Sequence, residues 1–151
     1  MLEVERPADM KAHIGQKIGT SDWVMVDQSM IDKFAEATGD HQWIHVDVER
    51  AKREMPGGRT IAHGYLTLSL LPRLSHEIYT IRKRSRGINY GSNKVRFTNM
   101  VPVGSKVRAR QKLLGVEPKG GGLQMTNEVT IEIEGQQRPA CVAETISIIY
   151  K

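Results

Sequence analysis

The sequence predicts an α+β fold in which an antiparallel sheet is wrapped around one central helix. Strand-like segments follow one another from about residue 87 onward with no helix between them, which is typical of α+β rather than α/β proteins. A leucine-rich segment before them predicts a helix that is buried on most of its sides. The chain has 151 residues, of which 39% are hydrophobic, and this is enough for one core. We therefore expect a single domain over residues 1–151.

The first elements expected along the chain are a short strand over residues 23–27 and a helix over residues 29–38. Ser29 is a suitable cap for this helix, and Asp32 completes a capping-box pattern three residues later. Gly39 suits the left-handed conformation that ends many helices. The helix should therefore end immediately before Asp40, and the turn should direct that side chain away from it.

The buried helix is expected to begin at or next to Gly64 and to end at Leu74, with Pro72 near its end. Residues 40–59 are expected to be irregular, because they close with a proline and two glycines. The apolar residues of the helix are Leu66, Leu68, Leu70, Leu71 and Leu74.

Later strands are predicted where apolar and charged residues alternate. The first covers residues 101–110, the second 125–134, and the third, rich in β-branched residues, 140–150. Turns are expected at 120–122 and 134–136, where glycines occur. Cys141 is the only cysteine, so an intrachain disulfide, a zinc ribbon and a CxxC redox site are excluded, and we expect it in the core.

The net charge of +5 favours an anionic partner. Arg82, Lys83, Arg84 and Arg86 place four cations within five residues, and Lys94 and Arg96 follow on a predicted strand. These cations could form a solvated loop, or they could bind the phosphates of a nucleotide-containing thioester through charge-assisted hydrogen bonds. Nucleic acid is disfavoured, because only 5% of the residues are aromatic and none lies within the cluster to stack on bases.

Nothing in the sequence predicts a membrane protein. No stretch approaches the roughly 20 apolar residues that span a bilayer, and residues 1–7 are too charged for a signal peptide. We expect a soluble, cytoplasmic protein.

The residues that suggest chemistry lie between residues 34 and 65. Asp40 and His45 place a carboxylate and an imidazole on one short segment, and with ordinary pKa values of about 3.9 and 6.5 the two groups can exchange protons near neutral pH. Gly64, at the start of the predicted buried helix, would offer a free backbone N–H to a developing oxyanion. Its lack of a side chain would also let a substrate approach closely.

The motifs Phe-Ala-x-x-Thr-Gly-Asp-x-x-x-Ile-His-x-Asp (residues 34–47) and Ala-His-Gly (residues 62–64) resemble the signature of MaoC-like, (R)-specific enoyl-CoA hydratases. The variant at residues 39–45 is most similar to the branch that contains nodulation protein N. The resemblance covers about residues 12–150. It implies a hot-dog fold and a homodimer whose sheets pair edge to edge. It also implies reversible hydration of trans-2-enoyl thioesters of coenzyme A or acyl carrier protein, with no cofactor or metal.

Hydration needs a base for water, an acid for the α-carbon and a donor for the thioester oxygen, and the resemblance assigns these roles to Asp40, His45 and Gly64. Which of the first two is the base stays open. Further substrate-binding candidates are Trp43, His63, Tyr65, Asn89, Arg82, Arg84 and Arg86. Trp43 would reshape the acyl pocket, whereas Asn89 starts a segment that can equally be a strand with a glycine bulge.

Three alternatives have to be weighed against this assignment. Asp40, His41, His45, Asp47 and His63 could be drawn as a metal cluster, but their spacing matches no recognised ligand motif. A hot-dog thioesterase would hydrolyse the thioester, and the hydratase-like spacing of Asp40 and His45 argues against it. A non-catalytic acyl-thioester-binding or regulatory protein would use the pair structurally, and sequence alone does not distinguish it.

Overall fold

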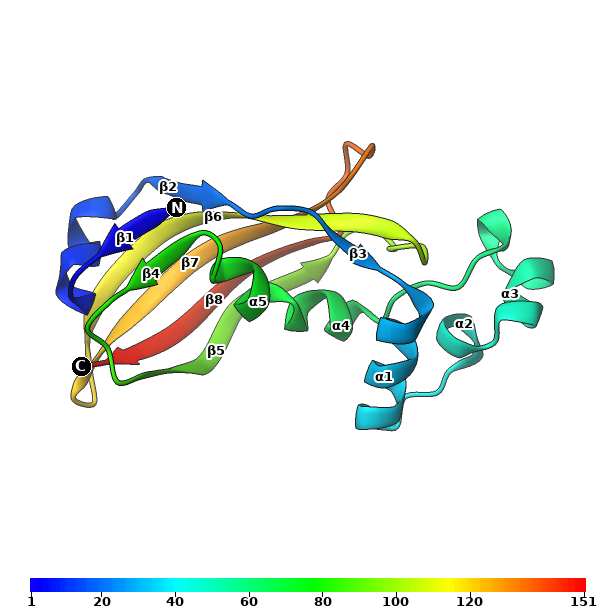
Figure 1. Cartoon of the computed structure of the whole chain (residues 1–151), viewed down its shortest axis with the longest axis horizontal. Coiled ribbons are helices and arrows are strands. Elements are labelled where there is room, and N and C mark those ends of the chain that lie inside the picture. The colour runs from blue at the N-terminus through cyan, green and yellow to red at the C-terminus, as the bar shows by residue number, and fades with distance from the viewer.

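The computed structural model describes residues 1–151 and is built on a strongly curved antiparallel sheet (Figure 1). The sheet order is β2-β6-β7-β8-β5, and β3 also pairs with β6. The strands are β2 (Lys17–Thr20), β3 (Val24–Val26), β5 (Arg86–Phe97), β6 (Ser105–Lys119), β7 (Gly122–Ile133) and β8 (Cys141–Tyr150). The predicted α+β class and hot-dog architecture are therefore confirmed.

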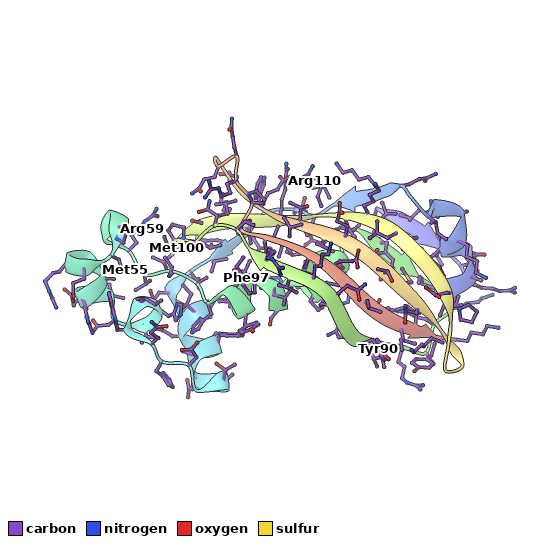
Figure 2. All side chains as sticks on the ribbon, turned by 180° about the vertical axis from the view of Figure 1, so that it is seen from behind. Met55, Arg59, Tyr90, Phe97, Met100 and Arg110 are labelled. Carbon is purple, nitrogen blue, oxygen red and sulfur yellow. The ribbon has the colours of Figure 1, made fainter.

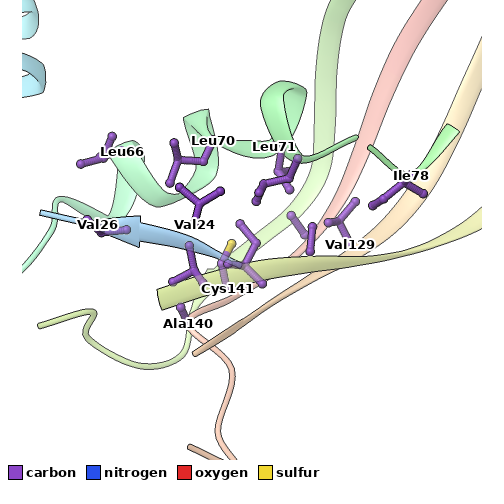
Figure 3. Packing of buried hydrophobic residues seen from close by; sticks show 14 of the residues in the cluster. Val24, Val26, Leu66, Leu70, Leu71, Ile78, Val129, Ala140 and Cys141 are labelled. Carbon is purple, nitrogen blue, oxygen red and sulfur yellow. The ribbon is translucent and has the colours of Figure 1, made fainter. Parts of the chain in front are cut away.

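The central helix lies against the concave face of the sheet, but it is broken in two. Helix α4 covers Gly64–Ser69 and α5 covers Leu71–Ser75. Pro72 lies in the first turn of α5, where its missing N–H costs little, and the single helix predicted over 64–74 is wrong in this respect. Leu66, Leu70 and Leu71 from this region belong to a buried cluster that also contains residues of the sheet (Figure 3).

One hydrophobic cluster joins the helices to the sheet. Cys141 is fully buried in it, as predicted, and burial raises the pKa of its thiol to about 11. Alternate residues of β7, from Met125 to Ile133, face this core while their neighbours face outward. The cluster thereby fixes the position of α4, whose first residue borders the site described below.

Strand β5 forms one edge of the sheet and is exposed along nearly its whole length. Register shifts at Asn89/Gly91 and Ser92/Lys94 confirm the bulged strand considered for this segment. Figure 2 shows Phe97 and Tyr90 toward opposite ends of β5. Both rings are about half exposed, which is unusual for large aromatic side chains on a strand.

The N-terminal residues add elements that the sequence patterns do not reveal. Strand β1 (Leu2–Val4) pairs in parallel with β4 (Tyr79–Ile81), and a 3₁₀ turn covers Pro7–His13.

Val101 and Val103 precede β6 rather than belonging to it, so the strand expected at 101–110 is shifted to 105–119. The glycine turns at 120–122 and 134–136 are confirmed, with positive φ at Gly120, Gly121 and Gly135.

Helices α1 (Gln28–Thr38), α2 (Trp43–Val46) and α3 (Val48–Glu54) gather beyond one end of the sheet (Figure 1). The expected Ser29 cap is wrong, because the Asp27 carboxylate accepts from the Met30 N–H at 2.9 Å and caps α1 one residue before it starts.

Residues 40–59, expected to be irregular, contain the two short helices α2 and α3 and a 3₁₀ turn at Pro56–Gly58. Asp47 caps α3 by accepting from the Arg50 N–H. None of the helices has the length and apolar character needed to cross a bilayer.

Candidate active site

A cavity of about 370 Å³ lies where α4 begins, beside the end of β5 and the loop that follows it. Both polar and hydrophobic residues line it. Its lining residues are His45, Ile61, Ala62, Gly64, Thr67, Phe97, Thr98, Asn99, Met100, Val101, Arg138 and Ala140.

Helix α2 carries His45 to this cavity and buries it to 6% exposure. Its Nδ1 lies 2.7 Å from the carbonyl oxygen of Ile61. A carbonyl oxygen can only accept, so Nδ1 carries the hydrogen. In the neutral ring, Nε2 is then the atom with a free lone pair, and this is the state that a general base needs.

The surroundings of His45 favour its neutral form. Burial lowers the pKa of His45 below its usual 6.5, and the nearby imidazole of His63 lowers it further. The hydrogen bond to Ile61 and the Asp40 carboxylate oppose these effects without reversing them. His45 is therefore neutral at neutral pH.

Asp40 follows the helix stop at Gly39, whose φ of 82° is left-handed and whose N–H donates to the Ala35 carbonyl. The carboxylate is exposed and accepts a long hydrogen bond of 3.3 Å from the Gln42 N–H. A carboxylate oxygen of Asp40 and one ring nitrogen each of His45 and His63 lie within 4.8 Å of one another. The structure thus brings together the acid/base pair that the sequence predicts.

His63 links the two members of this pair. Its ring stacks on His45 at a centroid distance of 3.8 Å, and its Nε2 donates to the Asp40 carbonyl oxygen at 3.0 Å. The ring is 2% exposed, and its Nδ1 has no hydrogen-bond partner. His63 thus contacts both groups but does not line the cavity, and its expected role in substrate binding stays a prediction.

Gly64 is the first residue of α4, so its N–H has no acceptor within the helix. A Cβ on Gly64 would meet the ring of Phe97 at 3.1 Å, closer than ordinary van der Waals contact. The lack of a side chain permits this close approach, whereas the backbone angles do not require glycine. Gly64 itself lines the cavity.

Two polar residues that the sequence analysis did not single out hold the His45 segment in place. The amide of Gln28 donates to the His45 carbonyl oxygen and to Asp32, both at 2.8 Å. Gln28 also accepts from the Thr60 hydroxyl at 2.6 Å. Thr60 is 1% exposed. A glutamine in the first turn of a helix carries no sequence signal for such a role, since its partners are 17 and 32 residues away.

Arg138 and Asn99 at the cavity mouth were also missed. Asn99 is held by Gln136 and by the Arg138 carbonyl oxygen. Arg138 is exposed and forms no ion pair. Both lie in loops without periodicity or motif, so only the fold reveals that they face the site.

The remaining substrate-binding candidates do not line this cavity. Trp43 packs beneath the Arg50 guanidinium, whereas Tyr65 contacts the Phe97 ring edge-on at the rim. Asn89 and Arg84 border a second cavity, under α5. Arg82 pairs with Glu3, and Arg86 lies over Tyr150, at the opposite end of β5.

Asp40, His45 and His63 could also offer ligands to a metal ion. Two of the four ring nitrogens already bind backbone carbonyl oxygens, which leaves Nε2 of His45 and Nδ1 of His63. The expectation that neither a metal nor a cofactor takes part stays a prediction.

Comparison with known proteins gives consistent matches. The model of the MaoC-like domain matches residues 9–134. The chain is 56% identical over 147 residues to 3-hydroxyacyl-thioester dehydratase Z of Mycobacterium tuberculosis, a match that covers 97% of each chain. It is 49% identical over 144 residues to nodulation protein N of Rhizobium leguminosarum bv. viciae, covering 94% of this chain and 89% of that one.

Solved structures agree with the fold. The structure of an (R)-hydratase from A. caviae involved in PHA biosynthesis superposes with a TM-score of 0.71 over 89% of this chain and 94% of that chain. The two sequences are 22% identical. At this identity the likeness shows a shared fold.

Proposed function

This chain belongs to the MaoC-like domain family, and we propose that it is an (R)-specific enoyl-thioester hydratase that adds water reversibly to trans-2-enoyl thioesters. The observation that carries this proposal is the approach of the Asp40 carboxylate to the neutral His45 imidazole, which lines one cavity together with Gly64. The related 3-hydroxyacyl-thioester dehydratase supports the same reaction class.

In the proposed reaction, Asp40 and His45 hold one water molecule between them. Nε2 of His45 takes a proton from this water as its oxygen bonds to the β-carbon of the enoyl group. Negative charge then builds up on the thioester oxygen, where the N–H of Gly64 donates to it. A proton returns from the Asp40–His45 pair to the α-carbon, so the net change is addition of one water, with no oxidant or metal required.

One assay tests this function against its rivals. Purified protein is incubated with crotonyl-CoA while enoyl absorbance and free thiol are both followed. A hydratase lowers the absorbance and releases no thiol, a thioesterase releases thiol, and a binding protein does neither. Release of thiol, or no change in either signal with short and long enoyl thioesters, would refute the proposal.

We further propose that the enzyme is a homodimer formed through β5. This strand has no partner on its outer edge, it is 12 residues long, and its two sides are largely uncovered. Long exposed edges of this kind are normally covered or paired. Pairing β5 with the same strand of a second copy would extend the sheet and cover Ile88, Tyr90 and Phe97, each between 42% and 52% exposed.

Such a dimer would bring the basic cluster, formed by Arg82, Lys83, Arg84 and Arg86, close to the active-site cavity of the other subunit. Within one chain, Arg86 and Phe97 lie at opposite ends of β5, roughly 36 Å apart for an extended strand. Antiparallel pairing about a twofold axis near the middle of β5 brings the partner's Arg86 beside Phe97. We propose that Arg82, Arg84 and Arg86 bind the coenzyme A phosphates at the partner's cavity, together with Arg138. A cytoplasmic location and a role in fatty-acid metabolism stay predictions.

A further inference from the structure

A second cavity of about 590 Å³ lies under α5, between this helix and the sheet, and the proposed reaction leaves it unexplained. Its floor is formed by the inner faces of β6, β7, β8 and β5. It begins at Leu68, one residue beyond Thr67, which borders the active-site cavity. The two cavities therefore follow one another along the central helix.

The floor of this second cavity is polar where a hot-dog core is expected to be apolar. Asn127 lies directly opposite Thr145 on β8, and Thr145 lies opposite Ser92 on β5. Gln111 borders the same cavity from β6 and accepts from the Ser75 hydroxyl of α5 at 2.8 Å. We call these four floor residues, Gln111, Asn127, Thr145 and Ser92, the polar row.

Asn127 is the buried residue of this row that has an unpaired side-chain oxygen. It is 4% exposed, yet its Oδ1 has no hydrogen-bond partner. Leaving a buried acceptor unpaired costs free energy, so a leucine of similar size would suit the fold better. An unpaired buried carboxamide that borders a cavity of this volume indicates a site for a ligand with a complementary polar group.

The distance to the active site identifies which part of a substrate would reach the row. Ala140, the residue before β8, borders the first cavity and Thr145 of β8 borders the second, five residues further on, or about 16 Å for an extended chain. Phe97 and Ser92 give the same spacing along β5. A thioester whose carbonyl lies at Gly64 would reach the polar row only with the far end of a long acyl chain.

We propose that the cavity under α5 receives the far end of a long acyl chain and that Asn127, together with Gln111 and Thr145, selects a chain that carries a hydroxyl group there. This inference rests on the proposed hydratase function. The unpaired Oδ1 needs a donor, which an oxo group lacks. A hydroxyl also accepts, so it pairs with either end of the carboxamide. A bare chain would leave the buried oxygen unpaired and lose affinity.

The experiment compares kcat/KM for three substrates: trans-2-dodecenoyl-CoA, the same thioester with a hydroxyl next to its methyl end, and its oxo counterpart. The wild type should prefer the hydroxylated substrate about tenfold over both others. Asn127→Leu should abolish this preference. Thr130→Val is the matched control, because Thr130 lies on the outer face of the same strand, and it should keep the preference.

Equal kcat/KM values for the three substrates in the wild type would overturn the inference, as would a preference that survives in Asn127→Leu. Urea unfolding checks that Asn127→Leu is folded, and we expect it to be at least as stable as wild type. Calorimetric titration with the saturated dodecanoyl and hydroxydodecanoyl thioesters reports the preference without turnover. A protein that binds the hydroxylated thioester more tightly but hydrates nothing would contradict the proposed function alone.

Discussion

At the scale of single residues, the candidate site combines groups that sequence can identify with groups that it cannot. Asp40, His45 and Gly64 lie in motifs, and the structure places all three at one end of α4. The stacking of His63 on His45 and the hold of Gln28 on the His45 carbonyl depend on segments that meet only in the fold. Such contacts have no local pattern, and so the sequence could not reveal them.

The acid/base pair gives the first prediction. Asp40→Asn and His45→Gln should each lower kcat by about 10² or more, because each removes a proton-transfer group while keeping similar size. Steady-state hydration of crotonyl-CoA measures this, and circular dichroism checks the fold. Replacing the neighbouring exposed His41 with glutamine is the control and should have little effect. Two folded variants with near-normal kcat would refute the mechanism.

The protonation state of His45 gives a second prediction. Its pKa lies below 6.5 because burial disfavours the charged ring. Activity that needs neutral His45 should therefore be retained as the pH falls to 6.5 and be lost only at lower pH, when Nε2 becomes protonated. A profile of kcat/KM against pH tests this in the free enzyme. An acidic limb centred above 6.5 would show that another group controls the reaction.

At the scale of secondary-structure elements, the sequence predicted periodic segments and glycine turns well, but it missed a break in the central helix and two short helices. Strand β7 follows from alternation, since one of its faces lies on the core, and β8 follows from its β-branched residues. The break between α4 and α5 escaped prediction because the leucines continue across it. The short helices α2 and α3 escaped it because their stability comes from caps and packing rather than from length.

The structure and the sequence-based expectation name different cap residues for α1, Asp27 and Ser29. Asp27→Ala should lower the free energy of unfolding by about 0.5–2 kcal/mol, because it removes the carboxylate that accepts from the Met30 N–H. Ser29→Ala is the matched control and should cost little. Urea unfolding of both variants provides the comparison. The reverse order would restore Ser29 as the cap.

At the scale of the whole molecule, the monomer has one long sheet edge that is neither covered nor paired. Sequence could not identify this edge, because strand order is set by long-range pairing. Only the resemblance suggested edge-to-edge assembly, and the exposed aromatic rings of β5 now give it a physical basis.

We predict that the protein sediments as a dimer and that Ile88→Lys combined with Tyr90→Lys shifts it toward a monomer. In the proposed twofold pairing of β5, the added charges would lie within the interface, where lysines on a strand edge disfavour edge-to-edge pairing. Met25→Lys is the control, since Met25 is equally exposed but lies on β3, at the other edge. Analytical ultracentrifugation distinguishes the outcomes, and a monodisperse active monomer of the wild type would contradict the dimer.

The last prediction joins the dimer to the basic cluster. Replacing Arg82, Lys83, Arg84 and Arg86 with alanine should raise KM for a CoA thioester more than it lowers kcat, since phosphates far from the reacting carbons bind ground state and transition state alike. The effect should weaken with salt, which screens exposed charges beyond about 8–10 Å. A pantetheine thioester, which lacks the nucleotide, is the control substrate and should be nearly unaffected.

Mixed dimers show from which subunit the cations act. One chain carries His45→Gln and keeps its cations, and the other carries the four alanines and keeps its His45. If the cations bind at the partner's cavity, this mixed dimer has one site with both an intact His45 and its phosphate-binding cations, and its KM should equal that of wild type. If they act within their own chain, no site has both, and KM should stay raised. An unchanged KM in the homodimer with four alanines would instead leave the cluster as surface charge, because binding of the phosphates would then not depend on it.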